Sequence, residues 1–392
     1  METIGQYFTA KTVSDMMVSM FQQETPEKII DLGVGKGALL YAAYNRYRGA
    51  EFYAADIDKK VILAVNAKLP FVKVLHIDGL TKGLPENMNL KIGSVDIAVC
   101  NPPYHRLKKT LQIKNLFKRT GLNNSVNLIK VSSDIVFLAQ NLQMLKKGGE
   151  LGIILPDSAF TGHEFAGLRE DLLTNHNIRG IIQLPDKIFK KTEARTHILL
   201  MEKCGPIQKR IPIYQSDFSG NIGKAVNISA DDLLYRMDHS YYAWKKLNKY
   251  SDDIMTIGDL NVDIKRGHKT KKYLQGKNIP FFHTTSFPAN INTRIDLKDS
   301  PVFDGIFAEP GDILIARVGK RCIGKVTMVN SGKQVISDCV YKVRAPEKHR
   351  NRIFRELISD TGQQWLRVIA HGVCAQVISK RDLLHFPLNI HS

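Results

Sequence analysis

The first half of the chain alternates short apolar runs with stretches in which apolar residues recur at helical spacing. The apolar runs have the length of buried strands, and a strand, helix, strand order predicts a parallel sheet covered by helices. The expected strands are 28–32, 51–56, 73–77, 95–100, 151–155, 178–184 and 197–201, and the expected helices are 38–47, 59–68, 134–145 and 165–174. Ligands of such doubly wound α/β domains bind beyond the carboxyl ends of the strands, so the residues after each strand are the functional candidates.

A second domain is expected after this region, because the pattern of apolar and polar residues changes near Ile222. Residues 237–253 are predicted to form a polar connecting helix or linker. Beyond them, short apolar runs are separated by Gly, Pro and Asn, which predicts a mixed domain of mostly β structure. Its expected strands are 311–318, 324–329 and 339–343, with a helix near 351–370. We therefore expect one domain over 1–235 and another over 236–392.

The net charge of +18 favours a polyanionic partner, because solubility alone does not require such an excess. Much of the charge falls in three segments that contain no acidic residue, 105–133, 264–277 and 313–337, and the first of these holds seven basic residues. Three such runs favour nucleic acid over a merely solvated surface. The candidate DNA-binding residues are Arg106, Lys108, Lys109, Lys265, Arg266, Lys269, Arg317, Lys320 and Arg321.

Membrane and metal-binding classes are not indicated. No run of about 18 apolar residues is present, and the N-terminus has no basic region followed by an apolar stretch, so we expect a cytoplasmic protein without a membrane partner. The five cysteines are scattered without metal-ligand spacing, which predicts reduced, mostly buried thiols.

A glycine-rich turn follows the first expected strand, which ends in Asp31. Gly33, Gly35 and Gly37 allow the backbone to bend sharply and to approach a ligand closely. Taken alone, this turn is compatible with a nucleotide, a flavin or no ligand, and it lacks the pattern of a phosphate loop.

Acidic residues follow the next two expected strands. Asp56 stands where an acid can accept both hydroxyl protons of a ribose, and Asp58 is the next candidate. Asp78 stands where a carboxylate can receive the amino group of an adenine ring. Each acid alone is more often a helix cap than a ligand, but acids at three successive strand ends are less easily explained as caps.

The fourth expected strand ends in Asn101-Pro102-Pro103-Tyr104. By itself, this sequence is compatible with a rigid turn after a buried strand, because two prolines exclude a helix or a central strand. Together with the glycine turn and the acids, it resembles the class I S-adenosylmethionine-dependent methyltransferases that methylate amino groups, whose signature is [DNS]-P-P-[YFW].

The resemblance extends over most of the chain and is closest to the gamma class of DNA adenine-N6 methyltransferases. That class includes TaqI-like enzymes and the modification subunits of type I restriction systems. The other similar segments are Gly5–Thr9, Met144–Phe160 and Leu184–Leu200 in the catalytic part, and Arg236–Tyr242, Gly311–Val329 and Val373–Leu388 in a C-terminal target-recognition domain. The implied fold is a Rossmann-like, mixed seven-stranded sheet followed by an α+β domain.

The resemblance also implies roles for individual residues. The side-chain oxygen of Asn101 and the carbonyl of Pro102 would accept the two amino hydrogens of adenine, while Tyr104 stacks on the extruded base and Phe189 packs against it. Neither a metal nor a strong general base is implied. The residues expected to bind S-adenosylmethionine are Tyr7, Thr9, Asp31, Gly33, Gly35, Asp56, Ile57, Asp78, Gly79 and Asn101.

We therefore expect a sequence-specific methyltransferase that acts on the N6 amino group of adenine in double-stranded DNA, after base flipping. It would serve a restriction-modification or related defence system, with a cognate restriction endonuclease or a specificity subunit as partner. Two alternatives stay open. One is methylation of RNA adenine or of a protein glutamine, and the other is a DNA-binding specificity protein whose methyltransferase domain is inactive.

Overall fold

The chain divides into two units, Met1–His239 (unit 1) and Ser240–Ser392 (unit 2). The computed structural model describes residues 9–189, 195–249, 254–290, 293–319, 321–372 and 376–388. The division follows His239, whereas the sequence suggested a boundary between residues 235 and 236. The two units are described separately below.

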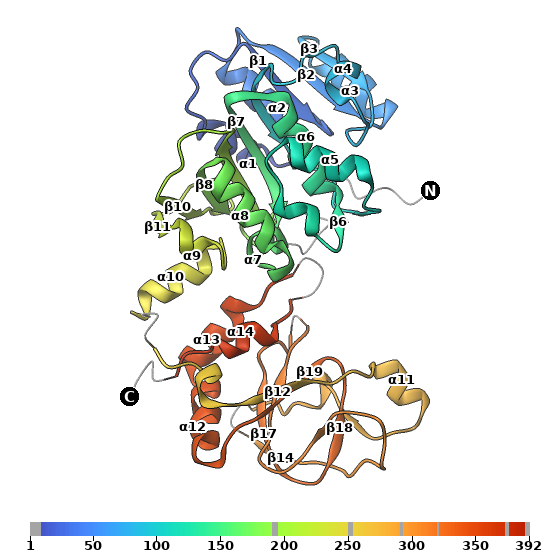
Figure 1. Cartoon of the computed structure of the whole chain (residues 1–392), viewed down its shortest axis with the longest axis vertical. Helices are drawn as coiled ribbons and strands as arrows, with labels where there is room; N and C mark the ends of the chain where they lie inside the picture. The colour runs from blue at the N-terminus through green and yellow to red at the C-terminus, as the bar shows by residue number, and fades with distance from the viewer. Residues whose placement is uncertain are drawn as a thin grey trace. The chain divides into compact units, whose positions relative to one another are not determined.

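Unit 1 is built around one mixed sheet with the strand order β11-β10-β8-β9-β7-β4-β1-β2-β3 (Figure 1). The adjacent strands β7, β4, β1, β2 and β3 run parallel to one another. Strand β9 runs antiparallel to both β7 and β8. The strands are β1 (Lys28–Leu32), β2 (Glu51–Asp56), β3 (Val72–His76), β4 (Val95–Cys100), β7 (Leu145–Pro156), β8 (Asn177–Gln183), β9 (Thr196–Glu202), β10 (Arg210–Gln215) and β11 (Val226–Ser229). The expected α/β sheet is confirmed.

Within the described residues the sheet has nine strands, so the expected number of seven is wrong. The additional strands β10 and β11 form the edge beyond β8. Strand β10 reads RIPIYQ and alternates buried with more exposed residues, and it carries a proline, which weakens a strand signal. Strand β11 has four residues, of which Ile228 alone is buried.

Helices cover both faces of this sheet. On one face, α1 (Lys11–Ser19) and α2 (Ala38–Arg46) pack into a core that contains Ile29 and Ile97 of the central strands. Successive strand residues point to opposite faces, so Ile30 and Ala98 face the other side. There α6 (Ser133–Met144), in which every residue is buried, packs on β4 and β7. The other expected helices correspond to α3 (Lys59–Lys68) and α8 (Ala166–Asn175).

Unit 2 contains two small sheets and several helices, which confirms the expected α+β class. The first sheet has the order β12-β19-β16-β17-β14 and the second β13-β18-β15. Their strands are β12 (Asp263–Arg266), β13 (Phe281–Phe282), β14 (Arg294–Asp296), β15 (Phe307–Ala308), β16 (Ile313–Ala316), β17 (Val326–Ser331), β18 (Gln334–Ile336) and β19 (Val340–Arg344). The described helices include α10 (His239–Leu247), which begins at the last residue of unit 1, and also α11 (Lys271–Gly276), α12 (Glu347–Ile358), α13 (Asp360–Ile369) and α14 (Lys380–Leu384).

The single helix expected near 351–370 is two helices. Ser359 takes an extended conformation between α12 and α13, and its side chain accepts a hydrogen bond from the Gly362 N–H, as an N-cap does. The second helix buries Trp365 completely, with ring centroids 5.5 Å from Tyr241 and 4.8 Å from Trp244. The aromatic contacts join α13 to α10, the helix expected near the start of the second domain.

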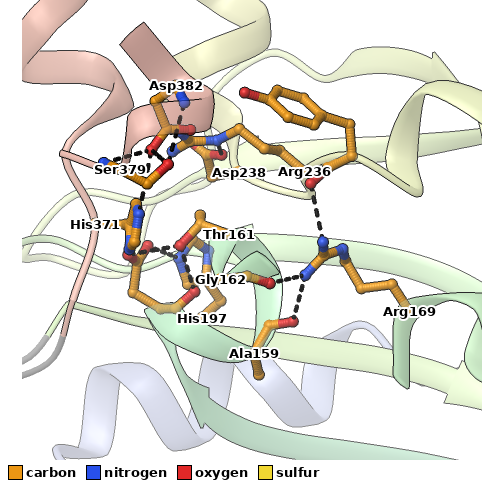
Figure 2. A network of polar contacts seen from close by, with 12 residues as sticks. Ala159, Thr161, Gly162, Arg169, His197, Arg236, Asp238, His371, Ser379 and Asp382 are labelled. Atoms are coloured by element: carbon orange, nitrogen blue, oxygen red, sulfur yellow. Dashed lines mark hydrogen bonds and ion pairs between the residues drawn. The ribbon is translucent and has the colours of Figure 1, made fainter. Parts of the chain in front are cut away.

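Two buried charged groups of unit 1, Arg169 and Asp157, have close polar partners, some of which Figure 2 shows. The guanidinium of Arg169 donates to the carbonyls of Gly162 (2.8 Å), Leu234 (3.0 Å) and Tyr235 (3.0 Å). His197 contacts the Asp157 carboxylate at 2.9 Å, and this contact lowers the pKa of Asp157 although burial alone would raise it. These contacts tie the turn after α7 (Asp157–Thr161) to residues 234–235, near the end of unit 1.

In the described ranges, no helix is long and apolar enough to cross a membrane. No cluster of potential metal ligands occurs in this part of the chain. The four cysteines that it contains are free, but Cys100 alone is buried and Cys204 is exposed, so the expectation of mostly buried thiols is wrong for them.

His176 provides a test of this packing. Its ring is 1% exposed; Nε2 lies 3.1 Å from the Thr120 carbonyl, and Nδ1 accepts from the Cys204 N–H at 3.4 Å. A neutral ring with its proton on Nε2 satisfies both contacts. Burial lowers the pKa of His176 to about 4.

Between pH 6.5 and 4, the unfolded chain therefore binds a proton at His176 that the folded chain does not. We expect this site to lower the free energy of unfolding by about 2–3 kcal/mol as the pH falls through that range. Denaturant unfolding at pH 7.5 and 4.5 measures the effect. His176→Gln should remove this part of the pH dependence, and the exposed control His163→Gln should keep it. Equal pH dependence in all three proteins would contradict the assignment.

Candidate active site

The Asn-Pro-Pro-Tyr sequence forms a turn at the carboxyl end of β4. The Asn101 Nδ2 atom donates to Thr9 Oγ1 at 3.0 Å. The Tyr104 hydroxyl lies 3.3 Å from Asn101 Oδ1 and 3.2 Å from the Ile154 carbonyl. The Asn101 amide is thus held at both ends, which fixes the position of its side chain at the end of β4.

A second support for this turn comes from the first residue of α6. The Ser133 hydroxyl donates to the Pro103 carbonyl and accepts from the His105 N–H at 3.0 Å. Residues on both sides of Tyr104 are therefore fixed to the N-terminus of a fully buried helix. Sequence reasoning missed Ser133, because nothing marks a serine about thirty residues downstream as a partner of this turn.

The glycine turn joins β1 to α2 in a conformation that requires glycine. Gly33, Gly35 and Gly37 have φ angles of +78°, +51° and +74°, which side-chain-bearing residues rarely adopt. The Gly35 N–H donates to Asp56 Oδ2 at 3.0 Å, so this turn is fixed to the end of β2. Backbone rather than side chains therefore forms this side of the site.

Asp31 is a buried carboxyl group beside this turn. It is 1% exposed, and its Oδ1 atom has no hydrogen-bond partner among the described residues. Burial raises the pKa of Asp31 well above its usual value, and the negative charge of Asp56 raises it further. The neighbouring Cys100 thiol also has a raised pKa, mainly because of burial and then because of Asp31. An uncompensated carboxyl at a strand end is well placed to receive a cationic group.

One cavity is lined by several of the residues that are expected to bind the cofactor. The residues that line it are Thr9, Asp31, Gly33, Val34, Gly35, Lys36, Ala38, Leu39 and Asn101. Three distant parts of the sequence, the start of the described chain, the β1 turn and the β4 turn, thus share one cavity. Parallel strands make this possible, since β1 and β4 are adjacent and end at the same edge of the sheet.

The other expected cofactor residues that the structure describes do not line this cavity. Asp56 accepts from the Gly35 and Asp58 N–H groups, and Asp78 accepts from the Leu80 N–H at 2.9 Å. Ile57 is 56% exposed. Asp58 caps α3 by accepting from the Lys60 N–H, so the alternative of a helix cap is the observed one for this acid.

Gly79 stands where no side chain fits. A Cβ atom there would lie 2.6 Å from the ring of Phe137, on α6. The same ring lies against Gly33. Phe137 is a second contributor that the sequence did not suggest, and it spaces the two glycine-containing turns.

One expected residue, Phe189, is buried rather than exposed on a binding surface. Phe189 is 3% exposed and belongs to the core that contains α1 and α2, so its role as the aromatic that packs on a base stays a prediction. Tyr7 lies outside the described residues, as does Lys320.

The expected basic contacts fall into two groups. Arg106 and Lys108 are exposed, as is Arg321. Lys109 is not a free cation, because its ammonium group donates to the carbonyls of Leu128 at 2.6 Å and Val126 at 3.0 Å. Lys109 therefore supports this loop, and its expected contact with DNA stays a prediction.

In unit 2, acidic residues from outside the basic runs meet several of the expected cations. Arg266 Nε and Arg317 Nη1 both donate to the Asp338 carbonyl, at 3.0 and 3.1 Å. Lys269 pairs with Asp304 at 2.8 Å, and Lys265 pairs with Asp263 at 3.1 Å. The two ion pairs offset the positive charges of Lys265 and Lys269. The shared Asp338 carbonyl holds the guanidinium groups of Arg266 and Arg317 beside each other.

Comparisons with known proteins agree with this arrangement. The sequence model of a family described as N-6 DNA methylase matches residues 1–273. The type II methyltransferase M.BsuBI of Bacillus subtilis is 23% identical over 64% of this chain and 51% of its own length. The methylase subunit of the type I restriction enzyme EcoEI of Escherichia coli is 24% identical over 68% of this chain and 58% of its own.

A solved structure is similar over nearly the whole chain. The type IIG restriction endonuclease BpuSI aligns with 96% of this chain and 57% of its own, at a TM-score of 0.50 and 13% identity. At this identity the likeness concerns the fold alone. The chain spans about half the length of the curated relatives described above.

The unpaired carboxyl of Asp31 predicts a stabilising substitution. A carboxyl whose folded pKa is raised contributes stability below its usual pKa and loses it as the pH rises, because the unfolded chain ionises more readily. Asp31→Asn removes this charge, so we expect the free energy of unfolding of the ligand-free protein to increase by about 1 kcal/mol at pH 8. The difference from the wild type should shrink toward pH 4. Denaturant unfolding at both pH values measures it, and a destabilised Asp31→Asn protein at pH 8 would contradict the account.

Proposed function

The chain belongs to the N-6 DNA methylase family, and on this premise we propose that it transfers a methyl group from S-adenosylmethionine to the N6 amino group of adenine in DNA. The observation that carries the proposal is the Asn101 amide, which is held by Thr9 and Tyr104 at a cavity that also contains Asp31. A fixed acceptor for an amino group thus stands beside a buried anionic site that suits a cationic cofactor.

The residues around the cavity fit S-adenosylmethionine. When bound, this cofactor supplies an electrophilic methyl group on a positively charged sulfonium. The unpartnered Oδ1 of Asp31 would receive a cationic part of the cofactor, whose charge offsets the unfavourable burial of the carboxylate. The positive-φ glycines leave backbone rather than side chains against the ligand. Asp56 accepts two N–H groups and keeps lone pairs for hydroxyl donors.

Asn101 and Pro102 would prepare the acceptor nitrogen. The lone pair of an exocyclic adenine nitrogen is delocalised into the ring, which makes it a poor nucleophile. Hydrogen bonds from the two amino hydrogens to the Asn101 side-chain oxygen and the Pro102 carbonyl would localise this lone pair. Thr9 and Tyr104 fix the amide in advance, so little reorganisation is needed when the base arrives. Tyr104 would also supply the stacking face for the base.

The polymer substrate that we propose is double-stranded DNA, with the target adenine turned out of the helix. The net charge of +18 and the exposed Arg106 and Lys108 beside the turn support a polyanion. We assign target recognition to unit 2. By analogy with the restriction and modification proteins among the relatives, a cognate nuclease or a specificity subunit would be the protein partner.

Asn101→Ala tests the proposed chemistry. We expect transfer of labelled methyl groups to DNA to fall at least a hundredfold, because one fixed acceptor of the amino group is lost. Cofactor affinity, measured by calorimetry, should change no more than about threefold. Asn45→Ala, at an exposed position of α2, is the matched control and should keep full activity. Near-normal turnover in Asn101→Ala, or label only in RNA or protein, would overturn the proposal.

Asp31→Asn should weaken cofactor binding while it stabilises the ligand-free fold. The loss of a buried charge beside a cationic ligand should raise the Kd of S-adenosylmethionine about tenfold or more. Calorimetric titration of both proteins measures the change, with the exposed Asp231→Asn as control. Unchanged affinity in Asp31→Asn would show that the carboxyl does not meet the cofactor.

A further inference from the structure

An isoleucine in the basic segment 105–133 is left almost fully in solvent. Ile129 is 90% exposed, whereas its neighbours Leu128 and Val131 are 5% and 1% exposed. It lies in the segment 105–133, between the 3-10 helix η1 (Asn124–Asn127) and the short strand β6 (Val131–Ser132). The segment therefore buries the apolar residues on either side and presents Ile129 outward.

The backbone around Ile129 is held from both sides. The Lys109 ammonium donates to the carbonyls of Val126 and Leu128, and the Leu128 N–H donates to the Ser125 carbonyl. After Ile129, Val131 pairs with Leu107 in the antiparallel ladder between β5 (Arg106–Leu107) and β6. Lys109 thus fixes the tip of this loop, which carries Ile129, in a defined conformation.

The loop tip is also connected rigidly to the proposed catalytic turn. Strand β5 begins two residues after Tyr104, and its partner strand leads directly into Ser133. Ser133 contacts the Pro103 carbonyl and the His105 N–H. The position of Ile129 is therefore set by the same short network that supports the residues proposed to hold the target adenine.

The charge around Ile129 indicates the chemistry of its partner. Residues 105–133 contain seven basic residues and no acid, and Lys130, Arg106 and Lys108 are exposed. A duplex combines an apolar base stack with a negatively charged backbone. An exposed aliphatic side chain among cations complements that combination, because apolar wedges enter base steps while cations meet the phosphates.

We propose that Ile129 is the wedge that enters the base stack of double-stranded DNA where the target adenine leaves it. This inference rests on the proposed function. Extrusion of a base leaves a gap in the stack, and burial of an isoleucine in that gap offsets part of the cost of unstacking. Ile129 is then a positioning residue, because it favours the extruded state without touching the reacting atoms.

The test compares two duplexes that contain the recognition sequence, which is first identified by sequencing methylated DNA from cells that express this chain. In one duplex the target adenine is paired with thymine, and in the other it faces an abasic site, which lowers the cost of extrusion. Transfer of labelled methyl groups gives kcat/KM for the wild type, Ile129→Ala, Ile129→Leu and Leu63→Ala. Leu63 is the matched control, a 70% exposed leucine on α3.

On the paired duplex, we expect Ile129→Ala to lower kcat/KM about tenfold, with Ile129→Leu close to the wild type and Leu63→Ala unchanged. On the abasic duplex, Ile129→Ala should approach the wild-type value. Thermal melting should not separate the variants, because Ile129 makes little contact with the folded protein. An unchanged rate on the paired duplex, or an equal loss on both duplexes, would overturn the wedge. A wild type that methylates neither duplex would overturn the proposed function itself.

Discussion

The Asn101 amide suits the proposed chemistry because hydrogen bonds at both of its ends fix its position. Thr9 accepts from its nitrogen and Tyr104 lies against its oxygen, so the amide presents a defined acceptor at the end of β4. The rest of unit 1 supports this arrangement. Adjacent parallel strands bring the ends of β1, β2 and β4 to one edge of the sheet, and Ser133 fixes the turn to a buried helix.

Asp31 lies at the same edge of the sheet and lowers the stability of the ligand-free protein. A buried carboxyl with an unpartnered oxygen beside another acid destabilises the fold, since a folded structure normally satisfies such groups. A cationic ligand would relieve both the missing contact and the excess of negative charge. Binding affinity at this site would then come partly from a group that weakens the empty fold, which is a common relation between function and stability.

The fold and the cavity were largely predictable because they depend on local signals. The central strands are apolar runs that end in Leu32, Asp56 and Cys100, and positive-φ glycines follow β1, so periodicity and composition locate both. The sequence did not predict the contacts with residues that folding brings in from distant positions in the chain. Ser133 and Phe137 support the site from α6, and Asp304 and the Asp338 carbonyl meet cations in runs that contain no acid. The carbonyl partners of Lys109 were hidden for the same reason, and the break at Ser359 depended on a single cap.

The central claim is that the methyl group goes to the N6 nitrogen of adenine in DNA, and the methylated nucleoside itself tests this most directly. The full chain is incubated with unmethylated duplex DNA and S-adenosylmethionine that carries a deuterated methyl group, and the DNA is digested to nucleosides for mass spectrometry. The account predicts deuterated N6-methyldeoxyadenosine, with no label in deoxycytidine. Label in a methylated cytosine, or transfer only to RNA or protein added in competition, would contradict it.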